Sequence, residues 1–253
     1  IINELMQGGL GGGELGVVVA PAGIGKSWVL SAMGAYGLSQ GLNVVHYTLE
    51  LNEAYVGLRY DSIFSGVESQ NLKYHKEEVM EKLFNLKGNL TIKYYPTKAC
   101  TVNTLSAHLK KVTTFGMRHA LGNIYEDLRG LAGELQVPIW TASQANRSAL
   151  DEDVIEATKV AESYAKVMTA DFVMSLSRKI EDKIGNTGRF HVIKNRFGPD
   201  GLTYPARINT NIGKIEIFES GSVQGKNVQH KINNRDNQVK EMLSARYEDL
   251  MNE

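Results

Sequence analysis

Residues 17–27, VVVAPAGIGKS, decide how the rest of the sequence is interpreted. The apolar, β-branched run predicts a buried strand, which breaks into a glycine-rich turn ending in Lys26 and Ser27. From Ala20 to Ser27 the letters match the phosphate-loop pattern G-x-x-x-x-G-K-[ST], except that Ala20 replaces the first glycine. Residues 26–40 predict a helix that stops at Gly41, so the strand–loop–helix context that the motif requires is present.

A loop of this kind binds the phosphates of a nucleoside triphosphate. Gly23 and Gly25 let consecutive backbone N–H groups point at phosphate oxygens, and the helix N-terminus adds partial positive charge. Lys26 is expected to bridge the β- and γ-phosphates, and the Ser27 hydroxyl to ligate Mg²⁺. Ala22, Ile24 and Trp28 complete the set of expected nucleotide-binding residues. The other interpretation, an ordinary glycine-rich turn, does not explain Lys-Ser at this offset, so we expect ATP and Mg²⁺ to bind here.

The composition excludes several other classes of protein. Lys plus Arg (28) balances Asp plus Glu (28), so no overall charge attracts nucleic acid or a membrane. No apolar run approaches the roughly 20 residues of a membrane helix. The single cysteine, Cys100, excludes an internal disulfide and fits a reducing cytoplasm, and the six histidines lack metal-ligand spacing. The sequence starts at Ile1 rather than Met, which predicts that it is part of a longer protein.

Strand and helix patterns alternate after the phosphate loop. Strands are predicted at 43–50, 90–95 and 137–143, and helices at 53–64, 77–86, 102–112 and 121–135, with Asn52 as an N-cap. Short strands follow at 172–177, 190–195, 204–209 and 214–218, separated by turn signals such as GNTG and GPDG. This order predicts an α/β fold with a mostly parallel central sheet and C-terminal antiparallel hairpins. We expect one domain over residues 1–219, then a polar tail, 220–253, with a short amphipathic helix at 239–251.

Four segments resemble the ATPase domain of the hexameric replicative helicases of the DnaB type, in that family's order. They are GGLGGGELGVVVAPAGIGKS (8–27), VVHYTLELNEAYVGLR (44–59), LGNIYEDLRGLAGELQVPIWTASQANR (121–147) and FHVIKNRFGPDG (190–201). The likeness covers residues 1–218 and looks closest to the phage branch. It implies a RecA-like ATPase core and a helicase motor that works in DNA replication. It further implies a homo-oligomer, a hexameric ring on single-stranded DNA, in the cytoplasm of a bacterium or phage-infected cell, with a primase or helicase loader as a partner.

The resemblance also assigns catalytic roles. It implies that Glu50, at the end of the second strand, is the general base for the attacking water, with Arg59 behind it. It implies that Gln144 senses the γ-phosphate. Lys194 and Arg196 stand two apart on a predicted strand, so their side chains leave the same face. In the family such a pair reaches the γ-phosphate of the neighbouring subunit's ATP, which requires a closed ring of heterologous interfaces.

Contact with DNA rests on the resemblance alone. Residues 148–159, SALDEDVIEATK, fall where the family has a loop that faces single-stranded DNA, and Arg147 and Lys159 are the candidate contacts. The segment is acidic, with Lys159 as its only base, so its charge does not favour a phosphate backbone.

One expected feature is missing from the sequence. Phosphate-loop ATPases carry an apolar strand ending in Asp, which helps to hold the magnesium. The resemblance puts that strand after the helix at 102–112, where the sequence reads only TTFGMRH, and Asp171 in VMTADF falls elsewhere in the order. Either the chain lacks the strand or the sequence is joined across missing residues. We favour the second explanation, because we expect the strand beside the phosphate-loop strand, where its loss would leave unpaired backbone groups. A real deletion should impair hydrolysis, so the ATPase and helicase assignment depends on this strand.

Two alternatives to a helicase stay open at the level of the sequence. A RecA- or KaiC-like recombination or regulatory ATPase shares the phosphate loop and the ring logic, although the Lys194-x-Arg196-x-Gly-Pro hairpin favours the helicase. A loader or scaffold that binds nucleotide without turnover is the non-enzymatic alternative.

Overall fold

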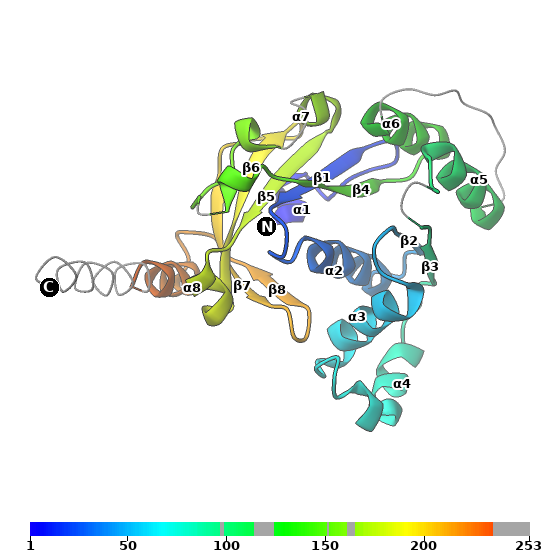
Figure 1. The fold of residues 1–253 in the computed structure, drawn as a ribbon, viewed down its shortest axis with the longest axis horizontal. Coiled ribbons are helices and arrows are strands. Elements are labelled where there is room, and N and C mark those ends of the chain that lie inside the picture. Colours follow the sequence, from blue (N-terminus) through cyan, green and yellow to red (C-terminus); the bar gives the residue numbers. More distant parts are fainter. Residues whose placement is uncertain (97–98, 114–123, 151, 161–164, 235–253) are drawn as a thin grey trace, which may run out of the picture.

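A curled β-sheet with helices on both faces forms the centre of the molecule (Figure 1). The structure is a computed structural model and describes residues 1–96, 99–113, 124–150, 152–160 and 165–234. The six-stranded sheet has the order β4-β1-β5-β6-β7-β8, and β2 and β3 form a separate pair.

Strand β1 (Leu15–Ala20) is buried along its whole length and is paired on both edges. It runs parallel to β4 (Ile139–Gln144) and to β5 (Phe172–Ser177). Alternate side chains of β1 enter different cores, as strand geometry requires. Val18 packs with Val29 of α2 (Lys26–Ser39), whereas Val17 packs with Leu128 of α6 (Ile124–Leu135). In Figure 1, α2 accordingly lies on one side of β1 and β4, and α6 on the other.

The sheet continues beyond β5 as antiparallel strands. These are β6 (Thr187–Asn195), β7 (Thr203–Asn209) and β8 (Lys214–Ile217). The predicted parallel core with C-terminal antiparallel hairpins is therefore confirmed. One local prediction was wrong: residues up to Gly185 form the short helix α8 (Ile180–Gly185), and β6 begins at Thr187 instead of Phe190. Asn186 ends α8 in the left-handed conformation, at φ 51°, which asparagine tolerates.

Strands β2 (Val44–Thr48) and β3 (Leu90–Tyr94) pair in parallel beside their own small core. Tyr60 of α3 (Glu53–Ser65) is buried there against Leu38 of α2. The Asn52 side chain accepts the N–H of Tyr55 and caps α3, as predicted. The chain then passes through η1 (Leu72–Tyr74) and α4 (Lys76–Phe84) before it enters β3.

The parallel strands are thus divided between two pieces, although α2 contacts β1, β4 and β2 alike. We expected the missing acid-bearing strand beside the phosphate-loop strand, and that prediction was wrong. Strands β4 and β5 occupy both edges of β1. Within the described residues, β4 and β2 each keep one edge without a strand partner, and a further parallel strand could pair there. The interval at 114–119 itself lies outside the described residues.

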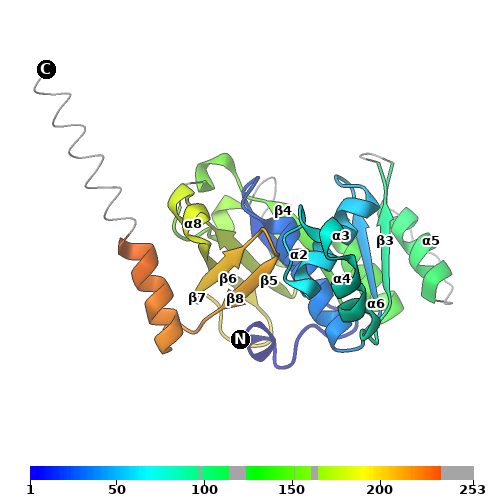
Figure 2. The ribbon, with the colours of Figure 1, turned by 90° about the horizontal axis from the view of Figure 1, so that it is seen from below.

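Short elements complete the chain: α1 (Ile2–Leu5), α5 (Val102–Thr113), η2 (Arg147–Ala149), η3 (Ala157–Lys159) and α7 (Ala165–Thr169). Residues 223–234 form a helix that the sequence analysis did not predict, with Val228 and Ile232 buried (Figure 2). The amphipathic helix predicted at 239–251 lies outside the described residues. None of the described helices is long and apolar enough to cross a membrane.

Candidate active site

The phosphate loop joins the end of β1 to the start of α2. Gly23 and Gly25 have φ angles of 72° and 111°, a region that favours glycine, and Gly25 is the N-cap of α2. The Gly25 carbonyl accepts the N–H groups of Trp28 and Val29 at 2.9 and 3.1 Å, so the helix starts directly after the loop. Ile24 is buried and anchors the loop, whereas Ala22 and Gly23 are exposed. The first-turn N–H groups, which lack intrahelical partners, are thereby directed at the loop.

A buried arginine supports this loop from behind. The Arg178 guanidinium, on a residue only 5% exposed, donates through Nε to the Thr187 carbonyl at 2.9 Å and through Nη2 to the Ile208 carbonyl at 3.2 Å. Its Nη1 lies 3.4 Å from the Ile24 carbonyl inside the loop. Burial lowers the pKa of Arg178, partly offset by Asp182. The sequence analysis missed this residue, because a lone Arg after a strand carries no motif.

Three predicted site residues meet around the loop. Burial lowers the pKa of Lys26, the Glu50 carboxylate raises it again, and Lys166 lowers it, so both groups lie within electrostatic reach of the Lys26 amine. Gln144 is the register partner of Ala20, directly before the loop. The carboxyl ends of β1, β2 and β4 therefore bring together an amine, a carboxylate and an amide.

Arg59 lies on the outer side of this group. Its guanidinium carbon is 4.9 Å from the centre of the Trp28 ring, a cation–π contact that joins α3 to α2. Burial lowers the pKa of Arg59, and Glu50 opposes that shift. The position agrees with the expectation that Arg59 stands behind Glu50.

The loop fits a nucleoside triphosphate with Mg²⁺ better than it fits a metal alone. Across the described ranges, no three His, Cys, Asp or Glu side chains gather as a preformed metal site. The half-buried Ser27 stands in the first turn of α2, where its hydroxyl could supply one oxygen ligand. Magnesium bound through one or two protein oxygens, with phosphates and water as the other ligands, suits such a site.

The segment after Gln144 folds back on the strand. Ala145 forms an isolated antiparallel bridge with Val160, and the Asn146 N–H donates to the Lys159 carbonyl at 2.8 Å. Residues 145–160 therefore form a loop closed at its base. The Lys159 amine lies 3.0 Å from the Glu152 carboxylate, so its charge is balanced inside the loop. The backbone of Arg147 lies in η2, at the same base.

Lys194 and Arg196 lie near the opposite end of β1. The Lys194 amine donates to the carbonyls of Val167 and Met168, at 2.9 and 2.6 Å, at the end of α7. Arg196 Nη1 donates to Asp171 Oδ1 at 2.9 Å, and 42% of the Arg196 side chain is exposed. Burial lowers the pKa of Lys194, with Arg196 and Arg129 adding to the shift and Asp171 opposing it. The two predicted cations thus share one cluster.

This cluster is too far from the phosphate loop of its own chain to act there. Asp171 Oδ2 accepts the N–H of Leu15, the first residue of β1, whereas the phosphate loop follows Ala20, its last. At roughly 3.3 Å per residue the two ends of β1 are about 17 Å apart. For the same reason Asp171 cannot serve as the magnesium carboxylate beside Ser27.

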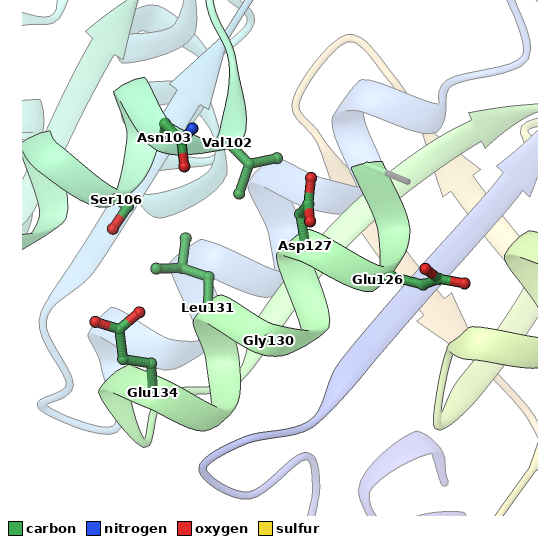
Figure 3. A pocket seen from close by; sticks show the side chains of 8 residues that line it. All are labelled: Val102, Asn103, Ser106, Glu126, Asp127, Gly130, Leu131 and Glu134. Carbon is green, nitrogen blue, oxygen red and sulfur yellow. The ribbon is translucent and has the colours of Figure 1, made fainter. Parts of the chain in front are cut away.

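A separate pocket between α5 and α6 does not match a triphosphate. It encloses about 120 Å³ and is lined by Val102, Asn103, Ser106, Glu126, Asp127, Gly130, Leu131 and Glu134. Figure 3 shows its three carboxylates along α6, with Val102 and Leu131 between the helices. Carboxylates repel phosphate, so we assign the nucleotide to the glycine-rich loop instead.

Comparison with known proteins agrees with this arrangement. No protein-family profile matches the chain. The chain is 29% identical over 234 residues to a DnaB-like replicative helicase of Enterobacteria phage T4, covering 78% of this chain and 49% of the relative. It therefore spans about half the length of that curated relative.

Two solved structures share the fold. The first, an isolated ATPase domain, superimposes with a TM-score of 0.71 at 18% identity, over 86% of this chain and 90% of that domain. A DnaB-like replicative helicase, solved in a study of its interactions with primase, gives a TM-score of 0.70 at 17% identity, over 85% and 59% of the two chains. The predicted RecA-like ATPase core is confirmed, and this chain is related in sequence and in fold to the DnaB-type replicative helicases.

Proposed function

We propose that this chain is the motor domain of a ring-forming replicative DNA helicase, which hydrolyses ATP at subunit interfaces and moves along single-stranded DNA. The observation that carries the proposal is the separation of two half-sites along β1. The phosphate loop follows Ala20, and the Lys194–Arg196 cluster lies by Leu15, about 17 Å away at roughly 3.3 Å per residue. A complete site therefore needs a second copy of the chain, and repeating that heterologous contact builds a ring.

The loop residues bind and orient the triphosphate. Backbone N–H groups from Gly23 to Ser27 surround the phosphates, and the Lys26 amine lies against the β- and γ-phosphates. Mg²⁺, held in part by the Ser27 hydroxyl, would neutralise charge on the phosphates. Glu50 accepts the proton of the attacking water.

The cations of the neighbouring chain complete the site. The Arg196 guanidinium, with the Lys194 amine beside it, stabilises the charge that develops on the γ-phosphate oxygens. Arginines in this role contribute roughly 10³–10⁵ in rate in other phosphate-loop enzymes.

Hydrolysis is coupled to DNA through the strand end that senses the γ-phosphate. Gln144 is register-paired with Ala20, and the closed loop 145–160 follows immediately. A shift of Gln144 on loss of the γ-phosphate would therefore move this loop as a unit. Arg147 and Lys159, at its base, are the proposed contacts to single-stranded DNA. The cytoplasm, and a primase or helicase loader as partner, belong to the same proposal.

The test is steady-state ATP hydrolysis with and without single-stranded DNA, on protein whose intact mass has been compared with 27.9 kDa. We expect DNA to stimulate hydrolysis, and Arg196→Ala to stop turnover while nucleotide still binds. Loss of binding in Arg196→Ala would argue against a role in trans. Assembly into filaments instead of rings on DNA would favour a RecA-like recombination ATPase.

A second candidate function is supported by the divided sheet. Because the described residues leave an edge of β4 and an edge of β2 without a strand partner, the acid-bearing strand has no counterpart among them. A scaffold or loader that binds ATP without turnover would follow if the strand is truly missing. Binding without hydrolysis, at a mass of 27.9 kDa, would decide for this function.

A further inference from the structure

Asp171 connects the two cationic side chains that flank it to the centre of the sheet. Its carboxylate is 4% exposed and accepts four hydrogen bonds. Oδ1 accepts Arg129 Nη2 and Arg196 Nη1, both at 2.9 Å, and Oδ2 accepts the Leu15 N–H at 3.0 Å and Arg129 Nε at 3.2 Å. The backbone is fixed as well, because the Asp171 N–H donates to the Leu15 carbonyl and the Asp171 carbonyl accepts the Arg196 N–H.

The two arginines use this carboxylate in different ways. Arg129, on α6, donates through two nitrogens in a fork, which fixes the plane of its guanidinium. Arg196 donates through Nη1 alone, and its side chain remains 42% exposed. Arg129 therefore holds the carboxylate in place, whereas Arg196 is aimed by it and keeps other N–H groups directed away from Asp171.

The charge balance indicates a ligand outside the chain. Lys194 lies within electrostatic reach of the same group, so three cations share one buried carboxylate. The Lys194 amine is otherwise bonded to two neutral carbonyls. The cluster carries a surplus of about two positive charges, which suits a polyphosphate from a neighbouring copy.

We propose that Asp171 is a positioning residue that holds the Arg196 guanidinium ready for the neighbouring subunit's γ-phosphate, and that Arg129 in turn fixes Asp171. This inference rests on the proposed function, since it needs Arg196 to act across the interface. Without the carboxylate, Arg196 is a long flexible side chain that must be ordered in each catalytic cycle. Because small misplacements of a catalytic group cost about 10²-fold, we expect kcat to fall about 10- to 100-fold in Asp171→Asn. The Kd for ATP, set by the chain's own phosphate loop, should not change.

Mixed rings give the sharpest test. Asp171→Asn has an intact phosphate loop and a misplaced Arg196, whereas Lys26→Ala has the reverse defects. In a one-to-one mixture, about a quarter of the heterologous interfaces combine the two intact halves. Hydrolysis in the mixture should therefore rise to about a quarter of the wild-type rate, well above the mean of the two variants. A mixture that gives only that mean would mean that Asp171 acts within its own subunit, and would overturn the inference.

Two further samples separate this inference from the proposed function. Arg196→Ala mixed with Lys26→Ala tests the action in trans alone: recovery there without recovery of the Asp171→Asn mixture sinks only the role of Asp171. Failure of both mixtures, or a wild type that does not hydrolyse ATP, overturns both proposals. If Asp171→Asn does not fold, Arg129→Gln replaces it and should show the same recovery at a smaller kcat loss, with its absence counting against the inference. Glu78→Gln, which removes the exposed ion pair to Lys82 on α4, is the matched control and should leave kcat unchanged.

Discussion

Replacing Arg178 by methionine tests whether the phosphate loop depends on support from behind. The substitution keeps a long, flexible side chain of similar reach but removes every donor. The carbonyls of Thr187 and Ile208 then lose partners at 2.9 and 3.2 Å, and the Ile24 carbonyl loses a weaker one at 3.4 Å. The first two bonds hold β6 and β7 together at the start of the hairpin, whereas the third holds the loop itself.

The magnitude follows from these three contacts. A hydrogen bond from a charged donor contributes about 1.5–3 kcal/mol, so the two short bonds represent roughly 3–6 kcal/mol. Methionine avoids the cost of burying a guanidinium, which returns part of that loss. We therefore expect the free energy of unfolding to fall by about 3 kcal/mol. We also expect the Kd for ATP to rise, because Ile24 is released next to Gly25.

Urea denaturation and nucleotide titration measure the two effects separately. Arg207→Met is the matched control, because Arg207 is exposed on β7 and stacks 5.3 Å from the Phe218 ring. It should lose less than about 1 kcal/mol, as surface substitutions do, with ATP binding unchanged. Equal destabilisation by the two variants would refute the role of Arg178 in the core. A destabilised Arg178→Met that binds ATP like the wild type would refute its role in the loop.

Other predictions concern the loop, the sheet and one buried histidine. Lys26→Ala should abolish nucleotide binding or turnover, measured by titration and steady-state hydrolysis; unchanged turnover would contradict the phosphate-loop assignment. Gly16→Ala would put a Cβ 2.4 Å from the Trp140 ring and should cost about 1–3 kcal/mol in urea denaturation, whereas Gly130→Ala, with no atom within 4 Å, should not destabilise. The pKa of His46 is lowered from 6.5 to about 4 by burial, helped by Arg59, so the folded protein refuses a proton that the unfolded chain takes up below pH 6.5. Stability should therefore fall as pH falls from 6.5 toward 4, by up to about 3 kcal/mol more than in His46→Gln, and parallel pH profiles would contradict this assignment.

The parts of the structure that the sequence predicted are those encoded locally. The phosphate loop, its strand and its helix lie within 25 consecutive residues, from Leu15 to Ser39, and glycine spacing and Lys-Ser mark them. The Asn52 cap and strand β5 were also found where they were predicted, because a cap and an apolar run leave a signal in neighbouring letters. Their catalytic roles remain predictions.

Contacts between distant segments left no such signal. Asp171 is 42 residues from Arg129 and 25 from Arg196, and only the packing of α6, β5 and β6 brings the three together. Arg178 reaches a carbonyl 154 residues away. The neighbours of β1 were likewise misjudged, because strand order in a sheet does not follow order in the sequence.

The length of β1 also sets how many sites an assembly contains. Each copy carries a phosphate loop at one end of the strand and an Arg196 cluster near the other, so each contact between copies makes one site. An open chain of copies then has one site fewer than it has subunits, and a single copy has none. Closing the ring adds the last site without adding a subunit. The rate per subunit should thus rise with protein concentration in steps of assembly, and a closed ring is the form in which no subunit is idle.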